Sequence, residues 1–228
     1  MRRTLAAAIS LLAVAACGGT AAPATSPTAD VGSGSLTGAG SSFTEPFYTK
    51  AFYAYNQAHG AVSVNYQPVG SGAGIQQFSK GTVDFGASDV PMTSAEQDGA
   101  GGPSTLVQIP TTLGVVSIAY NLPDVAKLQL DGPTLADIYI GKVKTWNDAE
   151  IKALNSGVNL PAKPISVVHR SDASGTSYAF TDYLAKVSPD WKSKVGVGKS
   201  VSWPAGVGAA QNQGVAQAVK NTDGGIGY

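Results

Sequence analysis

Hydrophobic and polar positions along the chain follow two spacings, one helical and one typical of strands. Between Pro46 and His59 apolar side chains recur at near-helical spacing, which predicts a helix with Pro46 near its start. Residues 62–66 alternate as a half-buried strand does, and residues 83–87 read as a buried strand. This alternation of short strands and helices predicts an α/β protein.

The later part of the chain continues this rhythm. We expect further helices at residues 74–79, 134–140, 177–186 and 211–220, and further strands at 106–109, 114–120 and 165–168. Residues 224–228 resemble the opening of one more strand and carry no polar tail. We therefore expect the natural chain to continue beyond Tyr228.

The first 35 residues lack the pattern of a folded domain. Arg2 and Arg3 precede an uncharged, largely apolar run that is shorter than the ~20 residues of a membrane-spanning helix. The run ends at Cys17, which predicts a lipoprotein signal peptide at 1–16 and lipidation of Cys17. An ordinary secretory signal with an incidental cysteine is the alternative. Residues 17–35 are small, polar and proline-containing, and we expect a disordered tether.

The composition narrows the classes of partner. Charged residues make up 13% of the chain, and 15 basic residues balance 15 acidic ones, so neither nucleic acid nor an anionic membrane surface is indicated. Cys17 is the only cysteine, which excludes an internal disulfide. With only His59 and His169 besides, a transition-metal site is not expected. We expect neither a metal nor a cofactor.

Three clusters of Ser, Thr and Gly precede predicted helices, at residues 38–44, 70–74 and 170–177. A helix start presents unpaired N–H groups and a partial positive charge, both of which attract anions. Glycine lets the backbone approach closely, and hydroxyl groups add donors. Ordinary helix capping explains any one cluster. Three of them in one short chain favour an anion site.

Arg170 heads the third cluster and is the only arginine left once residues 1–16 are removed. The remaining chain then has 13 basic and 15 acidic residues, and all its other basic residues are lysines. A guanidinium carries a permanent charge and a fork of donors that suits a tetrahedral oxyanion. Its position favours an anion ligand over a surface ion pair.

Asp89 follows the predicted strand at 83–87. A turn or cap is the common role of such an aspartate, but an anion site gives it another. There a carboxylate repels the ligand unless the ligand brings a proton, as phosphate does at neutral pH and sulfate does not. A buried polar group left unpaired by the wrong ligand discriminates by ~10⁴ or more. Asp89 therefore favours phosphate over sulfate.

Four motifs resemble the phosphate-binding proteins of bacterial high-affinity phosphate ABC transporters, the PstS family. They are Leu-Thr-Gly-Ala-Gly-Ser-Ser-Phe at 36–43, Val-Asp-Phe-Gly-Ala-Ser-Asp at 83–89, Asp-Ile-Tyr-Ile-Gly-Lys-Val-Lys-Thr-Trp at 137–146 and Ser-Gly-Thr-Ser at 174–177. The resemblance implies a two-lobed, periplasmic-binding-protein-like α/β fold with the ligand cleft between the lobes. Residues 36–110 would form an incomplete lobe I and residues 111–228 lobe II, because the C-terminal part that completes lobe I in the family is missing.

The resemblance also implies a binding site and a role. The phosphate ligands would be Ser42, the backbone of Phe43, Ser71, Asp89, Arg170, Ser174, Gly175 and Thr176, with Asp172 orienting Arg170. Ser42 stands where the family commonly has threonine. The protein would be a monomeric, non-enzymatic solute-binding lipoprotein. Anchored through Cys17 on the extracytoplasmic face of the cell membrane, it would capture inorganic phosphate for a membrane-embedded ABC permease.

Other functions stay open at this point. Another oxyanion as ligand, or a surface phosphate sensor without transport, fits the same motifs. A hydrolase is less favoured, because the chain has no Gly-x-Ser-x-Gly nucleophile elbow, although His169 beside Arg170 is a candidate base. The P-loop-like ending at residues 198–200 has Ser193 in place of the first glycine. Irregular spacing of the three tryptophans favours packing over sugar stacking.

Overall fold

The computed structural model describes residues 32–228, which form one compact unit. The predicted signal peptide at 1–16 and Cys17 lie outside the described residues, as does most of the predicted tether. The first strand, β1 (Gly34–Gly40), begins two residues before the expected start of the folded part, because Gly34 and Ser35 already pair with the neighbouring strand.

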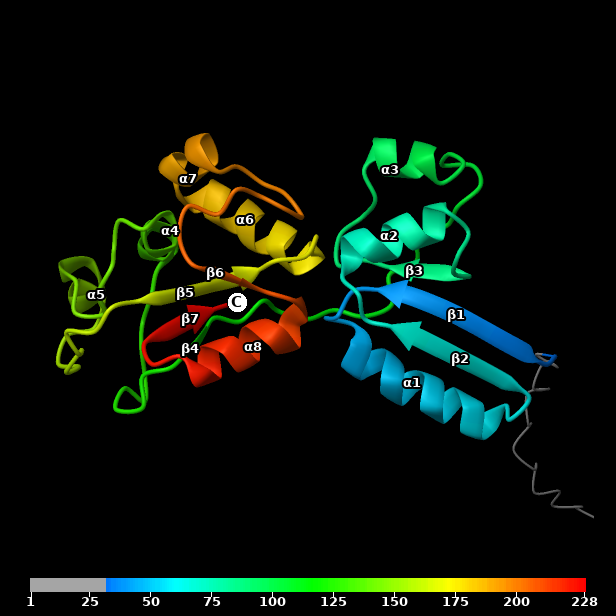
Figure 1. Cartoon of the computed structure of the whole chain (residues 1–228), viewed down its shortest axis with the longest axis horizontal. Coiled ribbons are helices and arrows are strands. Elements are labelled where there is room, and N and C mark those ends of the chain that lie inside the picture. The colour runs from blue at the N-terminus through cyan, green and yellow to red at the C-terminus, as the bar shows by residue number, and fades with distance from the viewer. Residues whose placement is uncertain (1–31) are drawn as a thin grey trace, which may run out of the picture. The chain divides into compact units, whose positions relative to one another are not determined.

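The first sheet is built from residues that precede position 88 (Figure 1). Its three strands are all parallel, in the order β2-β1-β3. The elements of this part are β1, α1 (Glu45–Ala58), β2 (Val62–Gln67), α2 (Ser71–Ser79), β3 (Phe85–Ala87) and α3 (Ser94–Gly99).

Helices α1 and α2 cover opposite faces of the first sheet (Figure 1). Successive side chains of a strand point to opposite faces, so Phe85 and Gly86 of β3 face different helices. Phe85 meets Tyr48 of α1 edge to face, with ring centroids 6.4 Å apart. Gly86 lies against α2, where an added Cβ would stand 3.1 Å from the Cβ of Phe78. A glycine at this position lets α2 approach the sheet closely.

The second sheet is built from residues that follow position 118. Its strand order is β4-β7-β5-β6, with β4 antiparallel to β7 and the other pairs parallel. Its strands are β4 (Ala119–Tyr120), β5 (Ser166–Arg170), β6 (Val207–Ala209) and β7 (Gly225–Gly227). The helices of this part are α4 (Gly132–Ile140), α5 (Ala149–Leu154), α6 (Gly175–Val187), α7 (Pro189–Lys194) and α8 (Gln211–Asn221).

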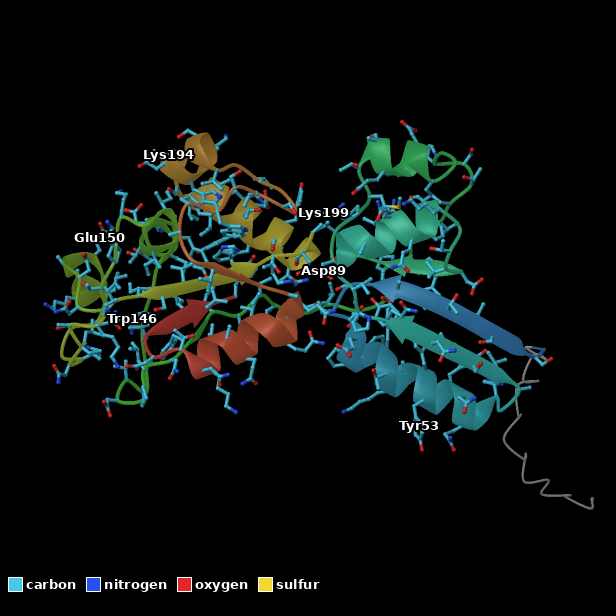
Figure 2. All side chains as sticks on the ribbon, viewed as in Figure 1. Tyr53, Asp89, Trp146, Glu150, Lys194 and Lys199 are labelled. Carbon is cyan, nitrogen blue, oxygen red and sulfur yellow. The ribbon has the colours of Figure 1, made fainter. Side chains whose placement is uncertain are left out.

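The two faces of the second sheet bury different sets of side chains. Val168 packs with Val215 and Val219 of α8 on one face. Val167, its neighbour in β5, points the other way, into the larger core that holds α4, α6 and α7. Trp146, labelled in Figure 2, is fully buried in that core, and its indole N–H donates to the carbonyl of Gly224 at 3.0 Å. This larger core fixes the end of β5, where Arg170 stands.

The α/β class is confirmed, and so are the helices expected near 46–59, 134–140, 177–186 and 211–220. The strands expected at 106–109 and 114–120 are wrong except for Ala119 and Tyr120. Leu113 and Val115 are 98% and 81% exposed. Apolar, β-branched residues favour a strand only where another strand pairs with them, and within residues 32–228 residues 106–118 find no such partner.

Within residues 32–228, none of the helices combines the length and the apolar character needed to cross a membrane.

Three short helices, α3, α5 and α7, were not predicted. Each has six residues, too few for a helical period to stand out. Helix α2 begins at Ser71, three residues before the predicted start. Ser71 therefore belongs to the first turn of a helix rather than to a preceding loop.

Candidate functional site

The clusters identified in the sequence lie where strands give way to helices. Strand β1 ends at Gly40 and α1 begins at Glu45; β5 ends at Arg170 and α6 begins at Gly175. In open α/β sheets such carboxyl ends of parallel strands are the usual place for ligands. The helices themselves have nine or more residues, so each start presents a full first turn of N–H groups.

Asp89, just after β3, is joined to three hydroxyl groups. Its carboxylate accepts a hydrogen bond from Ser41 through Oδ1 and from Thr176 through Oδ2, the latter at 2.8 Å. Its backbone N–H donates to Ser71 Oγ at 3.3 Å. A carboxylate offers about four lone-pair positions, so these contacts leave Asp89 able to accept another hydrogen.

Gly175 opens α6 directly against Asp89. An added Cβ would stand 2.7 Å from Ser71 Oγ and 2.9 Å from the Asp89 carboxylate, closer than side chains tolerate. Ser174 caps the same helix by accepting from the backbone N–H of Ser177 at 3.2 Å. The first turn of α6 therefore reaches Asp89 and Ser71 only because residue 175 is glycine.

Arg170 is held on two sides by neighbouring side chains and is only 3% exposed. Its Nε and Nη2 donate to the two carboxylate oxygens of Asp172 at 2.7 and 2.5 Å, and its Nη1 donates to Asn212 Oδ1 at 2.6 Å. Burial would raise the pKa of Asp172, but hydrogen bonds from Arg170 and from the Gln211 N–H lower it overall. A guanidinium has five N–H donors, so two remain available.

The start of α8 is a fourth helix start that contacts these residues. The backbone N–H of Asn212 donates to Ser42 Oγ at 3.2 Å, and that of Gln211 donates to Asp172 Oδ1 at 3.0 Å. Asn212 was not predicted as a site residue, because Ala209 and Ala210 precede α8 and carry none of the hydroxyl or glycine signals of the other starts. Ser41 was not predicted as a ligand either, although it lies in the Ser, Thr and Gly cluster at residues 38–44.

These residues form two hydrogen-bonded groups, which meet where Ser41 and Ser42 are adjacent in the chain. The first group surrounds Asp89 and the second surrounds Arg170. We refer to both groups together as the Asp89–Arg170 cluster: Ser41, Ser42, Ser71, Asp89, Arg170, Asp172, Thr176 and Asn212. Most of the predicted ligands belong to it, and the remaining ones flank it. Phe43 donates its backbone N–H to Ser41 Oγ at 3.0 Å, while Ser174 and Gly175 form the start of α6. The structure thus brings the predicted site residues together, from both sheets.

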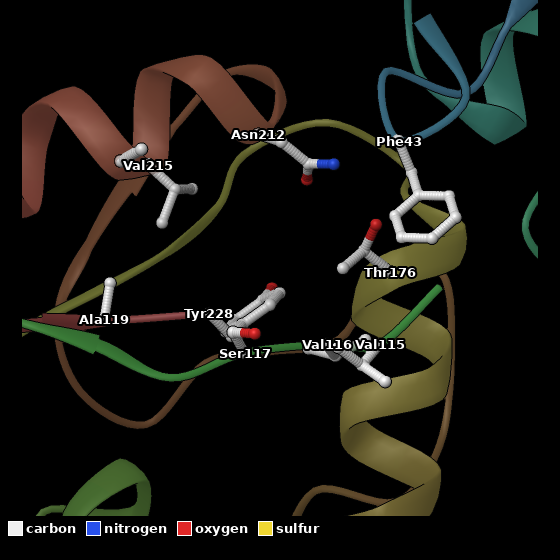
Figure 3. Close-up of a pocket in the computed structure, with 10 residues that line it drawn as sticks. Phe43, Val115, Val116, Ser117, Ala119, Thr176, Asn212, Val215 and Tyr228 are labelled. Atoms are coloured by element: carbon white, nitrogen blue, oxygen red, sulfur yellow. The ribbon is translucent and has the colours of Figure 1, made fainter. Parts of the chain in front are cut away.

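A cavity of about 210 Å³ lies beside the cluster (Figure 3). Phe43, Thr176 and Asn212 line it together with mostly apolar residues such as Val115 and Val215. Its walls are therefore less polar than the cluster. Oriented polar groups decide which ions bind, so we assign the candidate anion site to the cluster rather than to this cavity.

His169 does not join the cluster. Its ring stacks on Trp203 with centroids 4.7 Å apart and an angle of 10° between the planes, and its Nδ1 is 3.0 Å from the carbonyl of Arg170. As the neighbour of Arg170 in β5, His169 points to the other face of the sheet. Within residues 32–228, no group of three or more His, Cys, Asp or Glu side chains is placed to hold a metal ion. This geometry argues against His169 as a hydrolytic base.

Another contact between early and late parts of the chain joins Glu96 of α3 to Lys199 (labelled in Figure 2). The two Nζ–Oε distances are 2.6 and 2.7 Å. Glu96 also completes a capping box with Thr93. Burial would raise the pKa of Glu96, but the hydrogen bonds from Lys199 and Thr93 and the charge of Lys199 lower it overall.

We expect Glu96→Gln to lower the free energy of unfolding at neutral pH by about 1 kcal/mol, because glutamine keeps the capping box but loses the ion pair. The lowered pKa means that this contribution is fully present above the unfolded-state value of about 4.3 and is lost as the pH falls through the folded-state value. Urea unfolding of both proteins over a pH series measures the difference. Asp182→Asn, in an exposed pair with Lys186, is the matched control. A difference independent of pH would contradict the assignment.

Comparisons with known proteins give one family and several relatives. A family model described as a PBP superfamily domain matches residues 23–228. The phosphate-binding protein PstS of Xylella fastidiosa is 48% identical over 195 residues, which cover 85% of this chain and 52% of that protein. The protein of the same name from Haemophilus influenzae is 48% identical over 196 residues, covering 85% and 57%.

Among solved structures, a high affinity periplasmic phosphate-binding protein (PfluDING) bound with phosphate has a similar fold. Its TM-score is 0.66 at 24% identity, and the match covers 86% of this chain and 56% of that one. At this level of identity the likeness concerns the fold alone. The chain spans about half the length of the curated relatives named above.

Proposed function

Because this chain belongs to the PBP superfamily, we propose that it captures inorganic phosphate outside the cytoplasmic membrane and delivers it to a membrane-embedded ABC permease. One observation carries the proposal: the hydrogen-bonded group of a buried arginine with two unused donors adjoins, through the chain neighbours Ser41 and Ser42, the group of a carboxylate with unused acceptor capacity. A cation combined with such an acceptor suits an anion that still carries a proton. The proteins named PstS support the choice of phosphate.

We further propose that residues 36–110 and 111–228 form two lobes with the ligand between them. The division is supported by the two sheets, which fall within these ranges apart from the first two residues of β1. Phosphate would meet the backbone N–H groups of Phe43 and Gly175 and the hydroxyls of Ser42, Ser71, Ser174 and Thr176. It would give a hydrogen to Asp89 and accept two from Arg170.

The proposed ligand set is sufficient without a metal or a cofactor. A neutral hydrogen bond contributes about 0.5–1.5 kcal/mol, and one to a charged group contributes about 1.5–3 kcal/mol. Roughly eight such bonds cover the ~8 kcal/mol of a micromolar site after the costs of binding. Binding and release then require no chemical change in the ligand, and we propose no enzymatic activity.

The proposed setting is the membrane surface. A monomer acylated at Cys17 would stay on the extracytoplasmic face of the cell membrane, tethered by the segment that ends near residue 35. The support is the sequence alone: a short apolar run before the single cysteine.

Isothermal titration of the full chain with phosphate and with sulfate tests the proposed function. We expect phosphate to bind with a dissociation constant in the micromolar range or below, and sulfate to bind far more weakly. Circular dichroism of the same sample confirms that the chain is folded. Equal affinities for the two anions, or no phosphate binding by folded protein, would overturn the proposal.

A further inference from the structure

Asn212, at the start of α8, contacts two members of the cluster through two different groups. Its side-chain Oδ1 accepts from Arg170 Nη1 at 2.6 Å, and its backbone N–H donates to Ser42 Oγ at 3.2 Å. It therefore joins a residue that follows β1 to the arginine that ends β5. None of the sequence motifs contains it.

The turn that presents Asn212 is strained. Gln211 has a φ of 62°, and it is the one non-glycine residue within 32–228 with a positive φ. Residues other than glycine seldom adopt this backbone conformation, and where they do the surrounding structure holds them in it. The Gln211 N–H donates to Asp172 Oδ1 at 3.0 Å, so the same turn also reaches the partner of Arg170.

We infer that Asn212 is a positioning residue that determines which N–H groups of Arg170 face the anion, an inference that rests on the proposed phosphate site. Asp172 occupies the Nε and Nη2 side of the guanidinium. Asn212 accepts a hydrogen bond from Nη1 and thereby prevents the Nη1 end of the guanidinium from rotating. The two N–H groups left over are thereby held in one direction before the ligand arrives, which reduces the ordering cost of binding.

The chemistry of the amide matters as much as its position. Asp172 already places one negative charge against Arg170. A second carboxylate at position 212 would hold the guanidinium equally well but would repel an anion. The neutral oxygen of Asn212 orients Arg170 without this repulsion. The Asn212 N–H also orients Ser42: a hydroxyl that accepts through its oxygen keeps its own hydrogen for the ligand.

Two substitutions separate positioning from charge. Asn212→Ala removes the acceptor, and we expect phosphate affinity about tenfold lower, the loss of one hydrogen bond to a charged group. Asn212→Asp keeps the shape but adds charge, and we expect affinity at least a hundredfold lower. The Asn212→Asp deficit should grow from mildly acidic to mildly alkaline buffer, because phosphate gains a second negative charge over that range. Gln217→Ala is the control, because Gln217 lies on the same helix and its side chain donates to Asn221.

The measurements are phosphate titrations of the full chain and NMR signals of the Arg170 guanidinium without phosphate. We expect the Nη signals to be sharp in the unmodified protein and averaged by rotation in Asn212→Ala. If the unmodified protein binds no phosphate, the proposed function fails and this inference fails with it. If it binds phosphate and both variants bind within twofold of it, the inference alone is overturned. An Asn212→Asp deficit that is equal at both pH values would mean a merely structural role and would also overturn it.

Discussion

Asp89→Asn is expected to bind sulfate almost as well as phosphate, whereas the unmodified protein should prefer phosphate by ~10⁴. The physical reason is the balance of donors and acceptors. Ser41 and Thr176 already donate to the two oxygens of Asp89, so the carboxylate can meet a ligand only by accepting its proton. Sulfate has no proton to give. The amide of an asparagine can donate a hydrogen bond at this position. Sulfate would then accept a hydrogen bond where the carboxylate of the unmodified protein repels it.

The measurement is a pair of titrations, with phosphate and with sulfate, for each protein. Asp84→Asn is the matched control, because it makes the same chemical change just before β3. Asp84 accepts hydrogen bonds from Thr37, and the strand register places it far from the ligand loops. The control should keep the preference for phosphate. If Asp89→Asn also keeps the preference for phosphate, Asp89 is not the residue that distinguishes the two anions by accepting a proton from the ligand.

Arg170→Ala is expected to weaken the binding of phosphate and of sulfate alike, by about a hundredfold or more. Two charge-assisted hydrogen bonds are lost, each contributing about 1.5–3 kcal/mol. In addition, Asp172 would keep its charge without its partner and repel the ligand. Because Arg170 is buried, the same change also removes one half of a buried ion pair and is expected to destabilise the fold by about 3–5 kcal/mol.

Two further variants separate these effects. Arg170→Lys keeps the charge but not the fork of donors, and we expect an affinity between those of Arg170→Ala and the unmodified protein. Lys142→Ala removes a cation from an exposed pair with Asp137 and should leave both affinities unchanged. Denaturation curves recorded beside the titrations show which samples are folded. Folded Arg170→Ala with unchanged affinity would remove arginine from the proposed site.

The sequence predicts the fold best where an element carries its own signal. The helix at 46–59 has both a periodic apolar face and a proline at its start, and the structure places α1 at Glu45–Ala58. The apolar residues from 106 to 118 give an equally clear strand signal, yet most of them are exposed. Pairing depends on which strand lies alongside, and the local sequence contains no information about that neighbour.

The predicted site residues follow strands of two different sheets. Loops at the carboxyl ends of parallel strands meet at one edge of a sheet, which accounts for the loops of Ser42 and Asp89 after β1 and β3. The rule does not place Arg170, which ends β5 of the second sheet and reaches Ser42 through Asn212. Asn212 escaped prediction because its role depends on a backbone conformation and on the reach of Arg170. Neither property has a sequence signature when alanines precede the helix.

The three tryptophans of the chain pack in the larger core of the second sheet, whereas the rings around the first sheet are tyrosine and phenylalanine. Tryptophan emission should consequently follow the melting of one half of the molecule and ignore the other. Far-ultraviolet circular dichroism reports on both halves. Coincident denaturation curves from the two signals would mean that the halves unfold together, and separated curves would reveal a partly folded state.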